Sequence, residues 1–170
     1  MTQPASVAFD GNDLVLWVPA IADIEYPTLT ELEGGGVLDV TCYFTGDGWA
    51  PAMTEGVVND RRLCSRLQFQ QAGDEGWALP MSYVINPESP DDDEARETFV
   101  KDATGFFVER PAKAHADGID AWDWVAVWAV ELGKAQLSGR TQNGVWVMTQ
   151  MAYLVPPGVP DTPLVQVLGS

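Results

Sequence analysis

The chain has 170 residues, of which 46% are hydrophobic and 20% charged, a composition typical of one globular domain and unlike that of a disordered, collagenous or coiled-coil protein. Nine Lys and Arg against 25 Asp and Glu give a net charge of -16, which argues against tight nucleic-acid binding, although such a surface would let DNA pass without adhering. The longest apolar run, Trp124 to Val130, is far shorter than the roughly 20 residues of a membrane span, and no signal peptide is visible, so we expect a cytoplasmic protein with no membrane association.

The first half of the chain alternates apolar and polar residues, the pattern of half-buried strands. In chain order we predict strands over 13–18 and 38–44 and then a long inter-strand loop over about 45–60, which its length marks as functional or flexible. A hairpin follows, with strands 63–70 and 77–85 joined by a glycine-containing turn at 72–76.

One segment favours a helix. Ser89 before Pro90, with acidic residues in the next turn, is typical of a helix N-terminus. Ala95, Phe99 and Ala103 then recur every four residues, so we predict a flanking helix over about 90–103 that packs Phe99 against the sheet.

The second half returns to strand patterns, at about 106–110, 123–132, 145–155 and 164–168. The fold class is therefore mainly β, with one domain over 1–155. A proline-rich stretch then begins a C-terminal extension over 156–170, whose apolar end is expected to dock on its own sheet or on a neighbour.

Catalytic and metal-binding chemistry has little support. The acids at 91–94 diverge around one helical turn, and His115, the only histidine, has no second ligand or nucleophile motif. Cys42 and Cys64 are too few for a zinc site and are interpreted as small buried hydrophobes. We expect no enzymatic activity and no cofactor.

Tryptophans are unusually frequent late in the chain. Trp122, Trp124 and Trp128 share one parity of a predicted strand and Trp146 lies near the next, which predicts a common face. Three interpretations stay open: core, subunit interface, or a sugar-stacking platform. Both parities of these strands are apolar, which favours burial by neighbouring subunits as well as by a second sheet.

The only basic cluster is Arg61, Arg62 and Arg66. These residues are either a solvated strand end or a contact to the acidic surface of another copy. The second interpretation follows from the charge, because a subunit of -16 that self-associates needs local cations to offset repulsion.

Six short segments without a catalytic motif carry a family resemblance. They are VAFDGNDLVLWVP (7–19), TLTEL (28–32), DVTCYFT (39–45), DRRLCS (60–65), YVINP (83–87) and TGFFVER (104–110). In this order, over roughly residues 7–155, the chain resembles the major tail proteins, or tail tube proteins, of long-tailed actinobacterial bacteriophages.

The resemblance implies a β-sandwich or half-barrel with one flanking helix. Six copies would form a ring through a continuous inner β-barrel, and rings would stack into a hollow, non-contractile tube around a tape measure protein. Tail terminator and baseplate or distal tail proteins would be further partners. DNA would pass through the lumen without specific binding. The implied location is the virion tail, assembled in the host cytoplasm.

The resemblance also implies roles for individual residues. The predicted loop 45–60 becomes the ring-stacking loop, with Asp47, Trp49, Met53 and Glu55 as contacts and Trp49 as the apolar anchor. Asp39, on the polar face of its strand, is the candidate for the lumen.

Two functions of different classes follow. The first is a self-assembling tube subunit without enzymatic activity. The alternative is a monomeric carbohydrate-binding β-sandwich that uses Trp122, Trp124 and Trp128.

Overall fold

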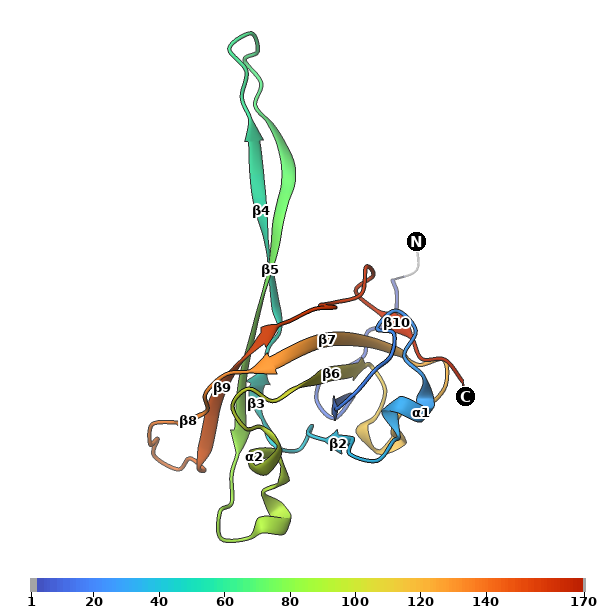
Figure 1. Cartoon of the computed structure of the whole chain (residues 1–170), viewed down its shortest axis with the longest axis vertical. Helices are drawn as coiled ribbons and strands as arrows, with labels where there is room; N and C mark the ends of the chain where they lie inside the picture. Colours follow the sequence, from blue (N-terminus) through green and yellow to red (C-terminus); the bar gives the residue numbers. More distant parts are fainter. Residues whose placement is uncertain (1–2, 170) are drawn as a thin grey trace.

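A computed structural model describes residues 3–169 and shows one ten-stranded sheet, antiparallel throughout, with few helices (Figure 1). The strands are β1 (Asp13–Val18), β2 (Leu38–Asp39), β3 (Phe44–Trp49), β4 (Ala52–Asp60), β5 (Phe69–Val84), β6 (Thr104–Pro111), β7 (Trp124–Leu132), β8 (Gln136–Leu137), β9 (Val147–Leu154) and β10 (Val165–Gln166). The helices are α1 (Leu29–Leu32) and α2 (Glu94–Thr98), with 3-10 turns η1 (Pro90–Asp92) and η2 (His115–Asp117). The predicted mainly β fold is confirmed.

The sheet has the order β2-β1-β6-β7-β9-β5-β3, and β10, β8 and β4 pair with β7, β9 and β5 respectively. In Figure 1, β6 and β7 run across the view while β5 runs along its vertical axis, so the sheet curls strongly. This curl lets one sheet enclose a core, as in a sandwich or half-barrel.

Two cores lie on opposite faces of β1, β6 and β7. The strand β1 shows why, because all of Leu14–Val18 is buried: Val15 and Trp17 enter the first core, whereas Leu14, Leu16 and Val18 enter the second. The first core is closed by β5, β9 and Phe99, and the second by α1 and β10. A strand that is apolar on both faces must be covered on both.

The predicted helix over 90–103 is shorter than expected. Asp93 interrupts it at φ -128°, and its fully buried carboxylate accepts the backbone N–H of Asn86 and pairs with Arg96. Phe99 does pack as predicted, edge to face with Trp17 at 5.5 Å between ring centroids. Asp93 therefore separates the 3-10 turn η1 from α2, and α2 itself ends at Thr98, before the predicted end at 103.

The predicted loop over 45–60 is wrong, since these residues form most of β3 and all of β4. The predicted hairpin is wrong as well: residues 72–76 lie inside β5, whose partner is β4, and the true connection is 61–68. The glycines explain the error. A Cβ on Gly73 would lie 3.0 Å from the backbone of Gly56, so these glycines permit close approach of two strands at a register shift rather than a turn.

The C-terminal segment is an integral part of the domain. Val165 pairs with Val125 of β7, and Val165 and Val167 are buried in the second core. The backbone of Leu168 also bonds with Pro27 and Leu29. Residues 156–169 therefore dock on their own sheet. Both cysteines, predicted to be buried, are exposed.

Candidate assembly surfaces

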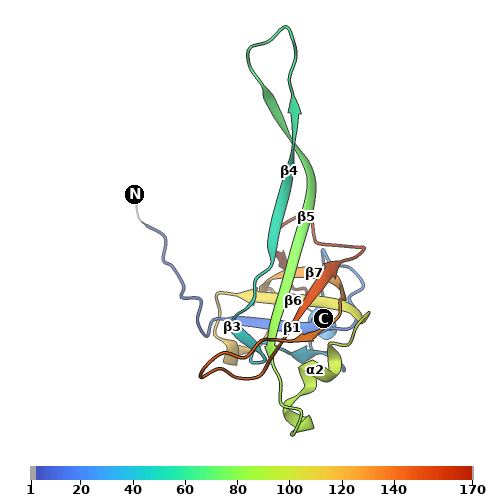
Figure 2. The same ribbon diagram turned by 90° about the vertical axis from the view of Figure 1, so that its left-hand side faces the viewer.

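A long hairpin extends beyond the body of the domain (Figures 1 and 2). We call residues 52–78, which comprise β4, its connection and the first part of β5, the arm; none of them is buried. The accessible surface of the chain is 11029 Å², against about 8,000 Å² for a compact chain of this size. The extended arm, with no buried residue, contributes to this excess.

The arm carries features of a surface that binds another molecule. Residues 69–78 of β5 pair only with β4, and β4 pairs only with β5, so both edges of the hairpin present unpaired backbone groups within residues 3–169. Large apolar side chains are exposed along it: Met53, Val57, Val58, Leu63, Leu67 and Phe69. Contiguous exposed apolar groups mark interaction sites on soluble proteins.

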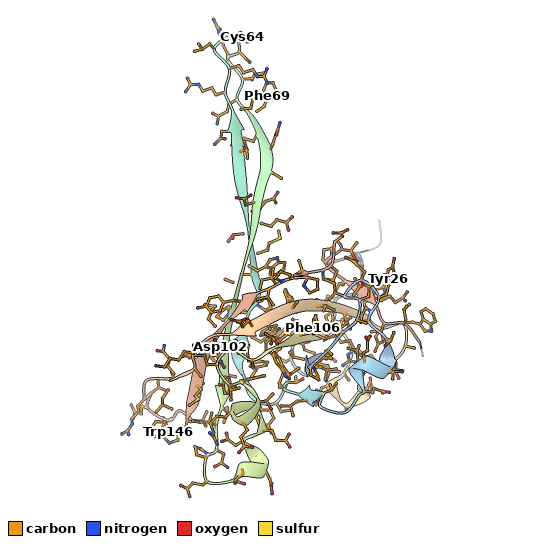
Figure 3. All side chains as sticks on the ribbon, in the orientation of Figure 1. Tyr26, Cys64, Phe69, Asp102, Phe106 and Trp146 are labelled. Carbon is orange, nitrogen blue, oxygen red and sulfur yellow. The ribbon has the colours of Figure 1, made fainter. Side chains whose placement is uncertain are left out.

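The connection 61–68, which we call the tip, holds the predicted basic cluster (Figure 3). Arg62 pairs with Asp60 at 3.1 Å, with the arginine side chain 70% exposed. Neither Arg61 nor Arg66 has an ion-pair partner among the residues that the structure describes. Leu63, between them, is fully exposed.

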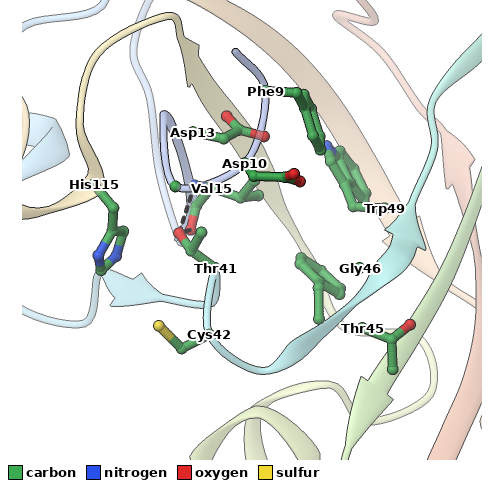
Figure 4. A pocket seen from close by; sticks show the side chains of 12 residues that line it. Phe9, Asp10, Asp13, Val15, Thr41, Cys42, Thr45, Gly46, Trp49 and His115 are labelled. Atoms are coloured by element: carbon green, nitrogen blue, oxygen red, sulfur yellow. Dashed lines mark hydrogen bonds between the residues drawn. The ribbon is translucent and has the colours of Figure 1, made fainter.

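A cavity of about 340 Å³ lies between the start of β1, the β2–β3 connection, β3 and η2. We call it the Trp49 pocket (Figure 4). Its walls combine aromatic groups with acids: Phe9, Phe44, Trp49, Asp10, Asp13 and His115. Seen in Figure 4, His115 and Trp49 lie at opposite ends, with Asp10 and Asp13 between them.

Trp49, predicted as the apolar anchor of a ring-stacking loop, is half-buried and packs against other aromatic rings of its own subunit. It stacks on Phe44 at 5.5 Å, lies 4.6 Å from Phe107 and meets Trp128 edge to face at 5.5 Å between centroids. Its Nε1–H donates to Glu109 Oε2 at 2.8 Å. Because β3 continues the sheet here, one side of the half-buried Trp49 ring packs against the first core, and the residue also lines the pocket.

Acidic groups predominate at the pocket, although the buried Arg110 offsets part of the charge of Asp13. Burial raises the pKa of Asp13, and burial together with the neighbouring Asp13 raises the pKa of Glu109, despite the hydrogen bond from Trp49. Among residues 3–169, none of Asp10, Asp13 and Glu109 forms an ion pair with a cation. The site therefore favours either protonation or an external cation.

Other predicted residues are dispersed. Asp39 ends β2, where its carboxylate bonds His115 Nε2 at 2.8 Å and Thr41 Oγ1 at 2.7 Å. Met53 and Glu55 lie on the arm, and Asp47 is exposed in β3, where it accepts from Thr45.

The four late tryptophans do not form one exposed surface. Trp128 is 6% exposed and belongs to the first core, whereas Trp122 and Trp124 are exposed near the C-terminal segment. Trp146 lies across the molecule, beneath the Arg140 guanidinium at 5.0 Å. A sugar-stacking platform of Trp122, Trp124 and Trp128 is therefore wrong, because a buried Trp128 offers no ring face.

The described residues form neither a metal site nor a membrane-spanning helix. Within residues 3–169, no three His, Cys, Asp or Glu side chains converge as metal ligands would, and none of the helices has the length and hydropathy needed to cross a membrane.

Comparison with known proteins agrees with this architecture. The profile of a family described as phage tail tube protein matches residues 1–166, nearly the whole chain. The chain belongs to the phage tail tube protein family. It is thus a structural component of a phage tail, without enzymatic activity, and its place is the virion tail.

The fold of this tail tube protein also occurs in a solved structure. One chain of the cryo-EM structure of the anti-feeding prophage baseplate, symmetrised six-fold, is 13% identical, with a TM-score of 0.55 over 98% of this chain and 99% of that chain. At 13% identity, this similarity shows a shared fold and nothing more. No curated protein matches.

The Trp49 pocket was not predicted from the sequence. One signal was available: Glu109 follows Phe107 by two residues in a strand whose face is otherwise apolar, which indicates a carboxyl group directed toward the core. The neighbours Phe9 and Asp13 carry no comparable pattern.

Proposed function

We propose that this chain is the repeating subunit of a non-contractile tail tube, in which six copies form a ring and rings stack into a hollow conduit for the genome. The observation that supports this best is the arm. Its edges are unpaired and its apolar side chains are exposed, which an isolated soluble protein avoids and an assembling one uses.

The arm supports assembly through two kinds of contact. Its free edges suit pairing with strands of a second copy, which would extend the sheet around a ring. Met53 and Glu55 on the arm, with Asp47 near its base, are our candidates for contacts between rings. The exposed Trp122, Trp124 and Trp146 are candidates for further subunit contacts.

The charge suits a conduit for DNA. With a net charge of -16, subunits around a lumen would repel phosphate groups and leave DNA mobile. Asp39, whose side chain is 44% exposed, is our candidate for a lumen acid. Tape measure, tail terminator and baseplate or distal tail proteins are the proposed partners, and assembly would take place in the host cytoplasm.

The test is negative-stain electron microscopy of the purified protein over a concentration series, with light-scattering mass on the same samples. We expect rings or hollow tubes with six-fold end views. The matched control replaces residues 54–76 with Asn-Gly, which closes the hairpin at the paired residues Met53 and Trp77. This variant should fold and stay monomeric. A wild-type chain that is monomeric at every concentration, with or without a nucleating tail complex, would refute the proposal.

A further inference from the structure

We infer that the arginines at the tip of one copy bind in the Trp49 pocket of a second copy. The inference rests on the proposed function and assigns the partner surface for the tip. The proposed occupant of the Trp49 pocket is a guanidinium group of a neighbouring chain.

Charge complementarity is the first argument. Arg61 and Arg66 are exposed and form no ion pair among the described residues. Asp10 and Asp13 in the pocket and Glu109 beside it form none either, and the one buried cation nearby, Arg110, only partly offsets the charge of Asp13. In a chain of net charge -16, an unpaired basic group and an unpaired acidic cavity that bind each other offset repulsion between copies.

The composition of the pocket is the second argument. Phe9 and Phe44 add aromatic surface to Trp49 beside the carboxylates. A guanidinium stacks on aromatic faces and forms forked hydrogen bonds with carboxylates, whereas an ammonium does so poorly. Leu63 and Leu67 of the tip add apolar groups that match the aromatic rim.

Geometry shows that the contact joins two copies. The tip stands at the end of a nine-residue strand, about 30 Å from its base, whereas the pocket lies in the body of the domain. Tip and pocket are therefore different surfaces of one chain, and their union is a head-to-tail contact. Such contacts close into rings or continue as open stacks, as a tube requires.

The native cysteines provide a direct test. Cys64 lies in the tip (Figure 3) and Cys42 lines the pocket (Figure 4), and both are exposed. A short bis-maleimide added to assembled protein should join Cys42 of one copy to Cys64 of another, identified by peptide mass spectrometry. Cys42→Ser and Cys64→Ser each remove the product. A predominance of Cys64 to Cys64 products would overturn the inference, because it places tips against tips.

A charge exchange tests the energetics. Arg61→Glu/Arg66→Glu should raise the critical concentration for assembly at least about tenfold, and Asp10→Arg should act similarly. Asp10 suits the change because its side chain is exposed. Mixed in equal amounts, the two variants should assemble together, since each then has a complementary partner.

The control is Lys101→Glu/Lys134→Glu, which alters the net charge as much as the tip variant does but lies elsewhere on the surface. It should assemble at nearly the wild-type concentration. Tip variants that assemble like wild type, or a mixture that fails to assemble, would overturn the inference while leaving tube formation intact. Failure of the wild-type chain to assemble refutes the proposed function instead.

Discussion

Replacement of Trp49 by alanine is expected to destabilise the isolated subunit by about 4 kcal/mol. Truncating a buried aromatic side chain costs about 3 to 5 kcal/mol, and the lower end applies because the Trp49 ring is only partly buried. Loss of its bond to Glu109, a partly buried carboxyl group, adds about 1 kcal/mol. The sum is a large part of the 5 to 15 kcal/mol typical of a domain.

Trp49→Phe separates the two contributions. The phenyl ring retains the stacking on Phe44 and Phe107, while the N–H donor to Glu109 is lost. We expect Trp49→Phe to lower the free energy of unfolding by about 1 to 2 kcal/mol. In a Glu109→Gln background the decrease should be smaller, because leaving a neutral amide without its hydrogen-bond donor costs less free energy than leaving a carboxylate without one.

The assay is urea unfolding at pH 7 followed by circular dichroism, at concentrations below the onset of assembly. A loss of 4 kcal/mol also lowers Tm by about 8 to 16 °C for a chain of this size. Wild-type stability in Trp49→Ala, combined with failure to form tubes, would refute this reasoning and show that the ring is a contact between subunits.

Three further predictions concern the same fold. Because burial raises the folded-state pKa of Glu109, its contribution to stability is greatest below its ordinary pKa and is lost as pH rises through the raised value. Glu109→Gln should therefore stabilise the subunit at neutral pH and make its urea midpoint less dependent on pH above the ordinary pKa of glutamate; an unchanged pH dependence would contradict this. Gly105→Ala should cost about 1 to 3 kcal/mol, since a Cβ there would lie 2.5 Å from the Trp17 ring, and an unchanged Tm would argue against this close packing. Val167→Ala, at a fully buried position, should cost about 2 kcal/mol in monomer unfolding; no loss would mean that the C-terminal segment is not docked on its own subunit in solution.

Local patterns in the sequence were sufficient for the mainly β class, for the strands predicted at 13–18 and 123–132, which form β1 and β7, and for the packing of Phe99. These features depend on alternation and on apolar periodicity, which neighbouring residues specify. The resemblance of many short segments in one order was likewise sufficient for the family.

The arm and the Trp49 pocket depend instead on pairing between residues distant in the chain. Gly56 and Gly73 look like turn residues until β4 and β5 are paired, when they become the point where the backbones approach. The sequence likewise predicts that Trp49 lies in a loop, whereas the pairing of β3 with β5 places it beside Glu109, sixty positions away. Glycine permits both a turn and a close approach, so its neighbours in sequence cannot distinguish them; the register of the strands does.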